Sequence, residues 1–335
     1  MAEKPNKILI IKPSAMGDIV LALPVLSALR ESFPQARISW LVRTEFAPLL
    51  GGHPYLDEII LFDRKYLGKA WKSTKALGAL LGLIKKLRKE NFDLIIDLQG
   101  LFRTASLGWL SGCPARIGTR TGREFSHIFY TRSIRQEQRT VHLVDYFLDI
   151  AKATGANTEK VEFVLPADAN ADGNVHKLLA DEKINSNNYC VLVPGSAHED
   201  KCWPTEKFAE LADAIASNFG FSVIAVGSAG ERQQAEIINT QAKTTVINLA
   251  GRTDIPTLIS LLRGAKMVVS NDTGPGHIAT ALQVPIVMVF GRTNPARVGP
   301  YSRPNSSAAV EPFGRGLTIN SYDAKYDIKN VTVEA

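Results

Sequence analysis

Three short polar segments carry residue types that could do chemistry, and each lies between an apolar run and a stretch with helical spacing. The first is residues 13–18, Pro-Ser-Ala-Met-Gly-Asp, where Gly17 permits close approach of a ligand and Asp18 supplies a carboxylate. Neither GxxxxGK[ST] nor GxGxxG is present, so this is not a standard nucleotide-binding loop. Asp18 therefore has two interpretations: a helix cap, where Asp is favoured, or a general base facing a cleft.

The second segment is residues 194–204, Pro-Gly-Ser-Ala-His-Glu-Asp-Lys-Cys-Trp-Pro. Ser196 could hydrogen-bond phosphate oxygens, and Lys201 could neutralise a diphosphate. Because most lysines are solvated, a purely surface role for Lys201 stays open.

The third segment is residues 270–277, Ser-Asn-Asp-Thr-Gly-Pro-Gly-His. It follows a predicted strand and opens a predicted helix, where unpaired N–H groups and the helix dipole attract a diphosphate. Gly274 lets the backbone approach the ligand. His277, in the first turn, either donates to a phosphate or is an ordinary surface histidine. Asp272 and Thr273 complete this predicted binding loop.

Further charged residues follow other predicted strands. Glu231 comes after the strand at 222–226, where an acid often binds a ribose hydroxyl; the alternative is an acid favoured by a helix dipole. Basic residues gather in the first half of the chain, either as a solvated face or as ligands of phosphates and carboxylates. They are Arg64, Lys65, Lys69, Lys72, Lys75, Arg103, Arg116, Arg120 and Arg123.

The elements that must position these residues alternate between strand and helix. Strands are predicted at 7–12, 38–42, 58–62, 93–97, 189–193, 222–226, 245–249, 267–270 and 285–290. Helices are predicted at 19–33, 70–89, after Gly100, and at 205–217, 231–239, 255–263 and 276–282. This alternation predicts an α/β fold with parallel sheets covered on both faces.

The alternation is interrupted over residues 154–188, which we interpret as the crossover between two domains, 1–165 and 166–335. We therefore expect two doubly wound, Rossmann-like halves with a cleft between them. Ligands of such folds bind at the carboxyl ends of the strands.

Composition narrows the class of protein. A chain of 335 residues is long enough for two domains, and a formal net charge of +6 is too small to indicate nucleic-acid binding. Three scattered cysteines favour a reducing compartment. No signal peptide, membrane-spanning run or carboxylate cluster that would form a metal site stands out. We expect a cytoplasmic protein, at most peripheral to a membrane, without a metal.

Taken together, the motifs resemble glycosyltransferase family 9, the bacterial heptosyltransferases of lipopolysaccharide core assembly. The resemblance rests on KPSAMGD at 12–18, DKCWP at 200–204 and DTGPGHIA at 272–279. DLQGLFRTA at 97–105, the segment 121–132 and Lys69-Ala-Trp are closer to the heptosyltransferase I type than to type II. The resemblance implies a GT-B fold, an ADP-heptose donor, no other cofactor, an inverting reaction and an anionic Kdo-bearing lipid A acceptor.

The resemblance also implies roles for individual residues. Asp18 matches the catalytic base, in an N-terminal domain that would bind the acceptor. Lys201 matches the diphosphate-binding lysine, in a C-terminal domain that would bind the donor. Besides Lys201, the donor side would comprise Ser196, Glu231, Asp272, Thr273, Gly274 and His277. The acceptor side would comprise Gly17, Arg64, Lys65, Lys69, Gln99, Arg103 and Arg123. We expect a monomer at the cytoplasmic face of the inner membrane.

Other functions stay open at this stage. A family 9 transferase could use another sugar or acceptor, and some nucleotide-sugar epimerases share the GT-B architecture. A non-catalytic saccharide-binding protein is a third alternative, which intact Asp18 and Lys201 disfavour. The tail after Leu317 lacks a strong helix, although GT-B chains usually return a C-terminal helix to the first domain.

Overall fold

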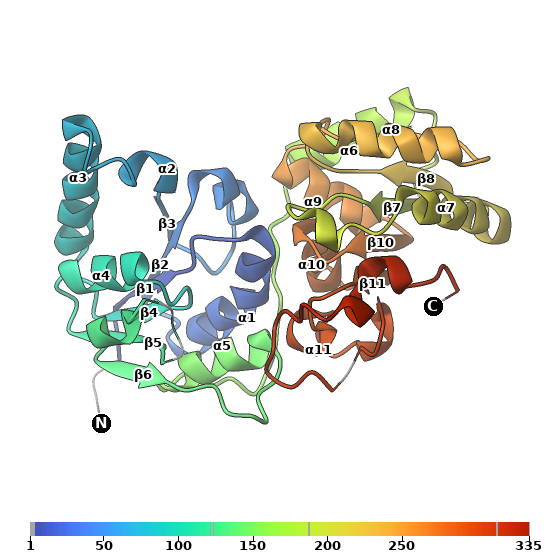
Figure 1. Ribbon diagram of the computed structural model, residues 1–335. Coiled ribbons are helices and arrows are strands. Elements are labelled where there is room, and N and C mark those ends of the chain that lie inside the picture. Colours follow the sequence, from blue (N-terminus) through green and yellow to red (C-terminus); the bar gives the residue numbers. More distant parts are fainter. Residues whose placement is uncertain (1–3, 121, 123, 187, 313, 335) are drawn as a thin grey trace. The chain divides into compact units, whose positions relative to one another are not determined.

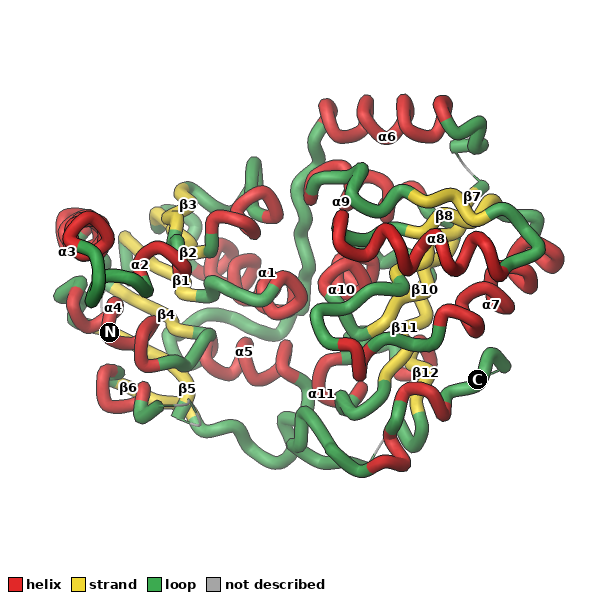
Figure 2. Tube along the Cα trace, turned by 45° about the horizontal axis from the view of Figure 1, so that its top comes forward, coloured by secondary structure: helices red, strands yellow, loops and turns green. Residues whose placement is uncertain are grey.

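The computed structural model describes residues 4–120, 122, 124–186, 188–312 and 314–334, in two compact units, Met1–Pro166 and Ala167–Ala335 (Figure 1). Each unit contains a sheet of six strands, and every strand pairing in both sheets is parallel. Figure 2 shows the strands of each unit flanked by helices. The predicted α/β fold with two doubly wound sheets is confirmed.

In the first unit the strand order is β3-β2-β1-β4-β5-β6. The strands are β1 Lys7–Ile11, β2 Arg37–Val42, β3 Glu58–Leu61, β4 Leu94–Asp97, β5 Ala115–Thr119 and β6 Arg132–Ile134. The helices are α1 Met16–Ser32, α2 Arg64–Leu67, α3 Thr74–Glu90, α4 Phe102–Leu110 and α5 Leu143–Lys152, with 3-10 turns η1 Thr44–Leu49 and η2 Ser126–Phe129. Residues 8 to 11 of β1 are fully buried, as expected of a strand with helices on both faces.

The second unit repeats the topology in the order β12-β11-β10-β7-β8-β9. The strands are β7 Tyr189–Val193, β8 Ser222–Ala225, β9 Val246–Asn248, β10 Met267–Asn271, β11 Ile286–Phe290 and β12 Ser307–Ala309. The helices are α6 Ala169–Asp181, α7 Thr205–Phe219, α8 Arg232–Gln241, α9 Ile255–Gly264, α10 Gly274–Ala281 and α11 Pro295–Val298. Five 3-10 turns complete it: η3 Glu199–Lys201, η4 Ala229–Glu231, η5 Pro304–Ser306, η6 Ala324–Tyr326 and η7 Ile328–Asn330.

The structure corrects two predicted elements. The crossover expected over 154–188 contains α6, which starts after Asp168, whose carboxylate accepts hydrogen bonds from two backbone N–H groups. Its buried Ala171, Val175 and Leu179 lie four residues apart, but the polar residues between them mask that spacing. The helix expected from residue 70 instead starts at Thr74, where the Ser73 hydroxyl accepts a hydrogen bond from Ala76 N at 3.3 Å.

The C-terminal tail packs on the second unit without an α-helix in its described residues, which agrees with the weak helical pattern after Leu317. Ile328 and Val331 are nevertheless buried, in one hydrophobic cluster with Trp203 and Phe208. Trp203 Nε1 also donates to the backbone oxygen of Val331 at 3.0 Å. The tail is therefore an integral part of this unit's core.

Within the described part of the chain, none of the helices is long and apolar enough to cross a membrane.

If the tail is part of the core, Ile328→Ala should destabilise the protein by about 2–5 kcal/mol, as for other buried Ile to Ala changes. Ile319 lies in the same tail but is 39% exposed, so Ile319→Ala is a matched control expected to stay within about 0.5 kcal/mol. Urea unfolding of the full chain measures both. A loss from Ile328→Ala as small as that expected of Ile319→Ala would show that the tail does not contribute to the core.

Candidate functional site

The reversal of strand order in each sheet determines which loops lie side by side. In the first unit, β1 has β2 on one side and β4 on the other, so the loops after β1 and β4 are neighbours. In the second unit, β7 lies between β8 and β10, which pairs the loop after β7 with the loop after β10. Such switch points are where doubly wound folds bind ligands. All three polar segments singled out in the sequence lie at these two points.

Asp18 lies in the first turn of α1, but it is not the helix cap. Ala15 occupies the capping position, and no side chain caps the helix there, so the capping interpretation of Asp18 is wrong. The Asp18 carboxylate instead pairs with Lys12 Nζ at 3.1 Å. Its side chain is 40% exposed, whereas that of Lys12 is 4% exposed. The Asp18 carboxylate is therefore accessible to solvent or a substrate, and the buried ammonium of Lys12 restrains it.

Lys12 was not selected as a site residue from the sequence. It directly follows β1, where its backbone oxygen accepts a hydrogen bond from Trp40 Nε1 at 3.1 Å. Its ammonium lies 5.4 Å from the centre of the Phe147 ring. Lys12 lies at the end of an apolar run that predicts a buried strand. Because a lysine is rarely buried without a partner, this position indicated an acidic side chain nearby.

Gln99 reaches the same loop from the neighbouring strand. Its side-chain oxygen accepts a hydrogen bond from Ser14 N at 3.4 Å. The turn that carries Gln99 is held by buried Asp97, whose carboxylate accepts from Gln99 N at 2.8 Å, from Gly100 N at 3.1 Å and from Tyr130 Oη at 2.9 Å. Burial raises the pKa of Asp97, against the opposing effect of these hydrogen bonds. Asp97 is thus a structural acid, and the structure brings Gln99 together with the loop that contains Gly17 and Asp18.

The expected acceptor-binding cations are less tightly grouped. Arg64 and Lys65 lie on α2, Lys69 follows that helix, and Arg103 lies on α4, all with exposed side chains. Among the described residues, no ion pair or side-chain hydrogen bond is recorded for these four cations. Arg123 lies outside the described residues.

In the second unit, Asp272 joins two of the expected site residues. Lys201 Nζ lies 2.5 Å from one carboxylate oxygen, and His277 Nε2 lies 3.5 Å from the other. Asp272 is nearly fully buried, and burial alone would raise its pKa; the hydrogen bond from His277 and the charge of Lys201 outweigh burial and hold that pKa well below its usual range. Asp272 therefore stays ionised and fixes both side chains.

Thr273 and Gly274 complete this arrangement at the start of α10. Thr273 is the N-terminal capping residue and Gly274 the first helical residue. Gly276 is also required by packing, because a Cβ there would lie 2.7 Å from Ser270 Oγ. The helix thus begins directly beside Lys201 and His277, with its N–H groups and positive dipole end available to an anion.

Asn271 is a positioning residue that the sequence interpretation passed over. It is fully buried at the end of β10. Its side-chain oxygen accepts from Trp203 N at 3.1 Å, and its amide nitrogen donates to Pro194 O at 2.5 Å. Asn271 therefore ties both ends of the 194–204 loop to the neighbouring strand. Between those ends, Asp200 pairs with Arg292 at 2.7 Å, which restrains the turn that carries Lys201.

Glu231 lies against the same loop, and Ser196 belongs to it. A Cβ on Gly195 would lie 2.0 Å from Glu231 Oε1, so the carboxylate fills the space left by that glycine. Its other oxygen accepts a hydrogen bond from Ser228 N at 2.5 Å. Ser196 is half-buried next to Gly195. Glu231 therefore lies close to the phosphate-binding candidates. Its carboxylate also stabilises the 3-10 turn η4 to which it belongs.

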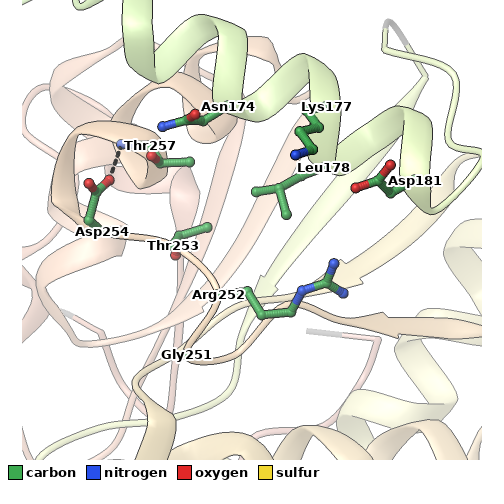
Figure 3. A pocket seen from close by; sticks show the side chains of 9 residues that line it. All are labelled: Asn174, Lys177, Leu178, Asp181, Gly251, Arg252, Thr253, Asp254 and Thr257. Atoms are coloured by element: carbon green, nitrogen blue, oxygen red, sulfur yellow. Dashed lines mark hydrogen bonds between the residues drawn. The ribbon is translucent and has the colours of Figure 1, made fainter.

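A separate cavity of about 640 Å³ lies between α6 and the loop before α9 (Figure 3). Lys177 and Asp181 line it from α6, and Arg252 and Asp254 line it from the loop. Asp254 is engaged as the cap of α9, through a hydrogen bond from Thr257 N at 2.9 Å. None of the expected site residues lines this cavity. In the part of the chain described, no group of His, Cys, Asp and Glu side chains forms a metal-binding cluster.

Several proteins to which this chain is similar are glycosyltransferases. The chain is 29% identical to lipopolysaccharide core heptosyltransferase OpsX of Haemophilus influenzae, over 99% of this chain and 94% of that one. It is 26% identical to lipopolysaccharide heptosyltransferase 1 of Escherichia coli K12, over 94% and 97%. The solved structure of Escherichia coli heptosyltransferase WaaC with ADP superposes with a TM-score of 0.77 at 25% identity, over 98% and 97% of the two chains. Residues 80–312 match the model of the family described as Glycosyltransferase family 9 (heptosyltransferase), so the chain belongs to that family and is a glycosyltransferase.

Proposed function

We propose that this enzyme transfers a heptose from ADP-heptose to the Kdo-bearing inner core of lipid A, with inversion at the anomeric carbon. The observation that carries the proposal is that Asp272 holds the Lys201 ammonium and the His277 ring at the start of α10, where helix N–H groups are also available to a leaving diphosphate. The OpsX and heptosyltransferase 1 names of the relatives, and the ADP in the WaaC structure, support this choice of donor and acceptor.

The second unit would bind the donor. Lys201 and the N–H groups around Thr273 and Gly274 would stabilise the negative charge that develops on the ADP diphosphate as the glycosidic bond breaks. Ser196 and His277 would donate hydrogen bonds to phosphate oxygens, and Glu231 would accept one from a ribose hydroxyl. Asp272 would act by orienting Lys201 and His277, because its own carboxylate is already committed to them.

The first unit would bind the acceptor and remove its proton. A sugar hydroxyl is a weak nucleophile, so Asp18 would accept its proton as the new bond forms. Lys12 would keep the carboxylate aimed outward, since its buried ammonium contacts the oxygen Oδ2. Arg64, Lys65, Lys69, Arg103 and Arg123 would bind acceptor phosphates and carboxylates, while Gly17 and Gln99 would shape the site. We propose that the enzyme works as a monomer at the cytoplasmic face of the inner membrane.

The proposed base is tested by Asp18→Asn. Asn keeps the size of the side chain but accepts no proton, so turnover should fall by about 10²–10⁴, the usual contribution of a general base. A coupled assay of ADP release measures turnover, and ADP affinity should stay near wild type. The melting temperature should fall, because the substitution leaves the buried Lys12 ammonium without its counter-ion. Glu206→Gln, which changes the exposed first-turn acid of α7, is the matched control and should be fully active. Wild-type turnover of Asp18→Asn would remove Asp18 from the mechanism.

The proposed leaving-group site is tested by Lys201→Met, which keeps the aliphatic stem and removes the charge. Loss of one such donor should lower turnover by about 10²–10³ and also weaken ADP binding. The pKa of Asp272 should rise towards its ordinary value, because the neighbouring charge is gone. Calorimetric titration with ADP gives the affinity, and Lys266→Met at an exposed lysine of the same unit is the control. Unchanged ADP affinity would place the diphosphate elsewhere.

The proposed acceptor side is tested by the charge reversals Arg64→Glu and Lys65→Glu in one variant. The KM for the acceptor should increase at least about tenfold, while ADP affinity stays unchanged, and added salt should raise the wild-type KM because exposed charges are screened. The double reversal Lys243→Glu and Lys266→Glu, at two exposed lysines of the second unit, makes the same change in net charge and is the control. If the two reversals leave acceptor kinetics intact, α2 does not contribute to acceptor binding.

A further inference from the structure

The positive charge of this protein is concentrated in one segment. Residues 63–90 contain nine basic and two acidic residues, a net charge of +7, whereas the whole chain has a formal net charge of +6. The rest of the chain is therefore close to neutral. In the structure this segment is α2, the turn after it and α3.

The same segment exposes large apolar side chains. Trp71 is 78% exposed, Leu77 43% and Leu81 57%. The opposite side of α3 packs normally, with Leu87 buried in a hydrophobic cluster of the first unit and Leu80 and Ile84 against it. The helix thus has an inner apolar face and, in addition, two leucines on its outer face.

Three lysines share the outer face of α3 with these leucines. Leu77, Leu81, Lys85 and Lys89 follow one another at four-residue spacing, which places them in a row along the helix, and Lys75 is exposed near the start of the helix. Lys86 and Arg88 are engaged, with Glu58 at 2.8 Å and with the backbone oxygen of Leu110 at 2.7 Å. For Lys75, Lys85 and Lys89, no partner is recorded within the described ranges.

We propose that this outer face, defined by Trp71, Lys75, Leu77, Leu81, Lys85 and Lys89, docks on the surface of an anionic phospholipid bilayer. The inference deepens the proposed function, because a lipid-linked acceptor would be presented at such a surface. The face is made of other residues than the proposed acceptor cations Arg64, Lys65 and Lys69. It would hold the enzyme on the membrane, and they would hold the sugar.

The pattern of side chains favours a bilayer over an acidic protein. Helices that lie in a membrane interface combine lysines with leucine and tryptophan, as this face does. A lysine can bury its stem beside the leucines and keep its ammonium among the lipid headgroups. Tryptophan is enriched at the same depth. In interfaces between proteins, by contrast, lysine is depleted relative to the rest of the surface, so a face with three lysines fits an acidic protein less well.

Trp71 itself is the most direct probe. The chain has four tryptophans; Trp40 and Trp203 are buried, so in a Trp109→Phe variant the exposed fluorophore is Trp71. Adding vesicles of phosphatidylcholine with phosphatidylglycerol should shift its emission to shorter wavelength, because the ring leaves water. Vesicles of phosphatidylcholine alone should give little shift. No shift with anionic vesicles would overturn the proposal.

Vesicle co-sedimentation of the full chain tests the other residues. Replacing Lys75, Lys85 and Lys89 by Gln should weaken binding by about a hundredfold, at about fivefold for each charge near an anionic surface. The pair Leu77→Ser and Leu81→Ser should weaken it by about tenfold or more. Phe219→Ser, which removes a 60% exposed aromatic ring from the second unit, is the control and should bind like wild type.

Activity on a water-soluble acceptor without acyl chains separates this proposal from the proposed function. The face variants should keep wild-type turnover on that acceptor and lose activity only when the acceptor is embedded in vesicles. If vesicle binding requires the acceptor lipid, or if the variants bind anionic vesicles like wild type, the face is not the docking surface. If the wild type binds vesicles through this face but transfers no heptose, only the proposed function fails.

Discussion

Each site in this protein depends on the point at which a parallel sheet reverses its strand order. β1 between β2 and β4, and β7 between β8 and β10, force loops that are distant in sequence to lie side by side at the carboxyl edge of the sheet. In the first unit this places the Asp18 loop against Gln99, and in the second it places the Lys201 loop against Asp272. Without that reversal, these polar segments would not lie next to one another and would not form a common site.

The two sites use the same kind of ion pair in opposite ways. In the first unit the lysine is buried and the carboxylate of Asp18 is 40% exposed. In the second the carboxylate of Asp272 is 7% exposed and Lys201 is the more accessible partner, at 20%. In both, the buried ion compensates the charge of the exposed one and restricts its orientation, as a buried charge must be paired. In the mechanism proposed above, the accessible member is the carboxylate that would accept a proton in the first unit and the cation that would stabilise a phosphate in the second.

The two units also differ in whether their basic side chains are paired with acids. In the second unit, the buried Asp272 pairs with Lys201 and His277. In the first unit, α3 carries exposed lysines for which the described residues show no partner, on the same face as Leu77 and Leu81. Compensated charges suit a site that must hold a small ligand in one geometry. Exposed lysines without a counter-ion suit a broad anionic surface, where no single geometry is required.

Much of this could be predicted from the sequence, because it depends on local pattern. Apolar runs alternating with amphipathic stretches determined two parallel sheets, and glycines and polar residues after strands marked the loops around Asp18, Lys201 and Asp272. Family membership followed from the same motifs. Helix α6 was missed because its apolar residues Ala171 and Val175 are sparse among polar ones.

Only the tertiary structure decided which side chains meet. The structure shows that Ala15 rather than Asp18 occupies the cap position and that Lys12 pairs with Asp18. It also shows that Asn271 holds the loop that carries Lys201. These arrangements depend on how neighbouring elements and the turns between them pack. Residue types and spacing along a chain restrict backbone conformation, but burial and pairing depend on what packs from elsewhere in the fold. The sequence therefore determined the elements and the candidate residues, and the packing of neighbouring strands and loops determined which of those residues form a site.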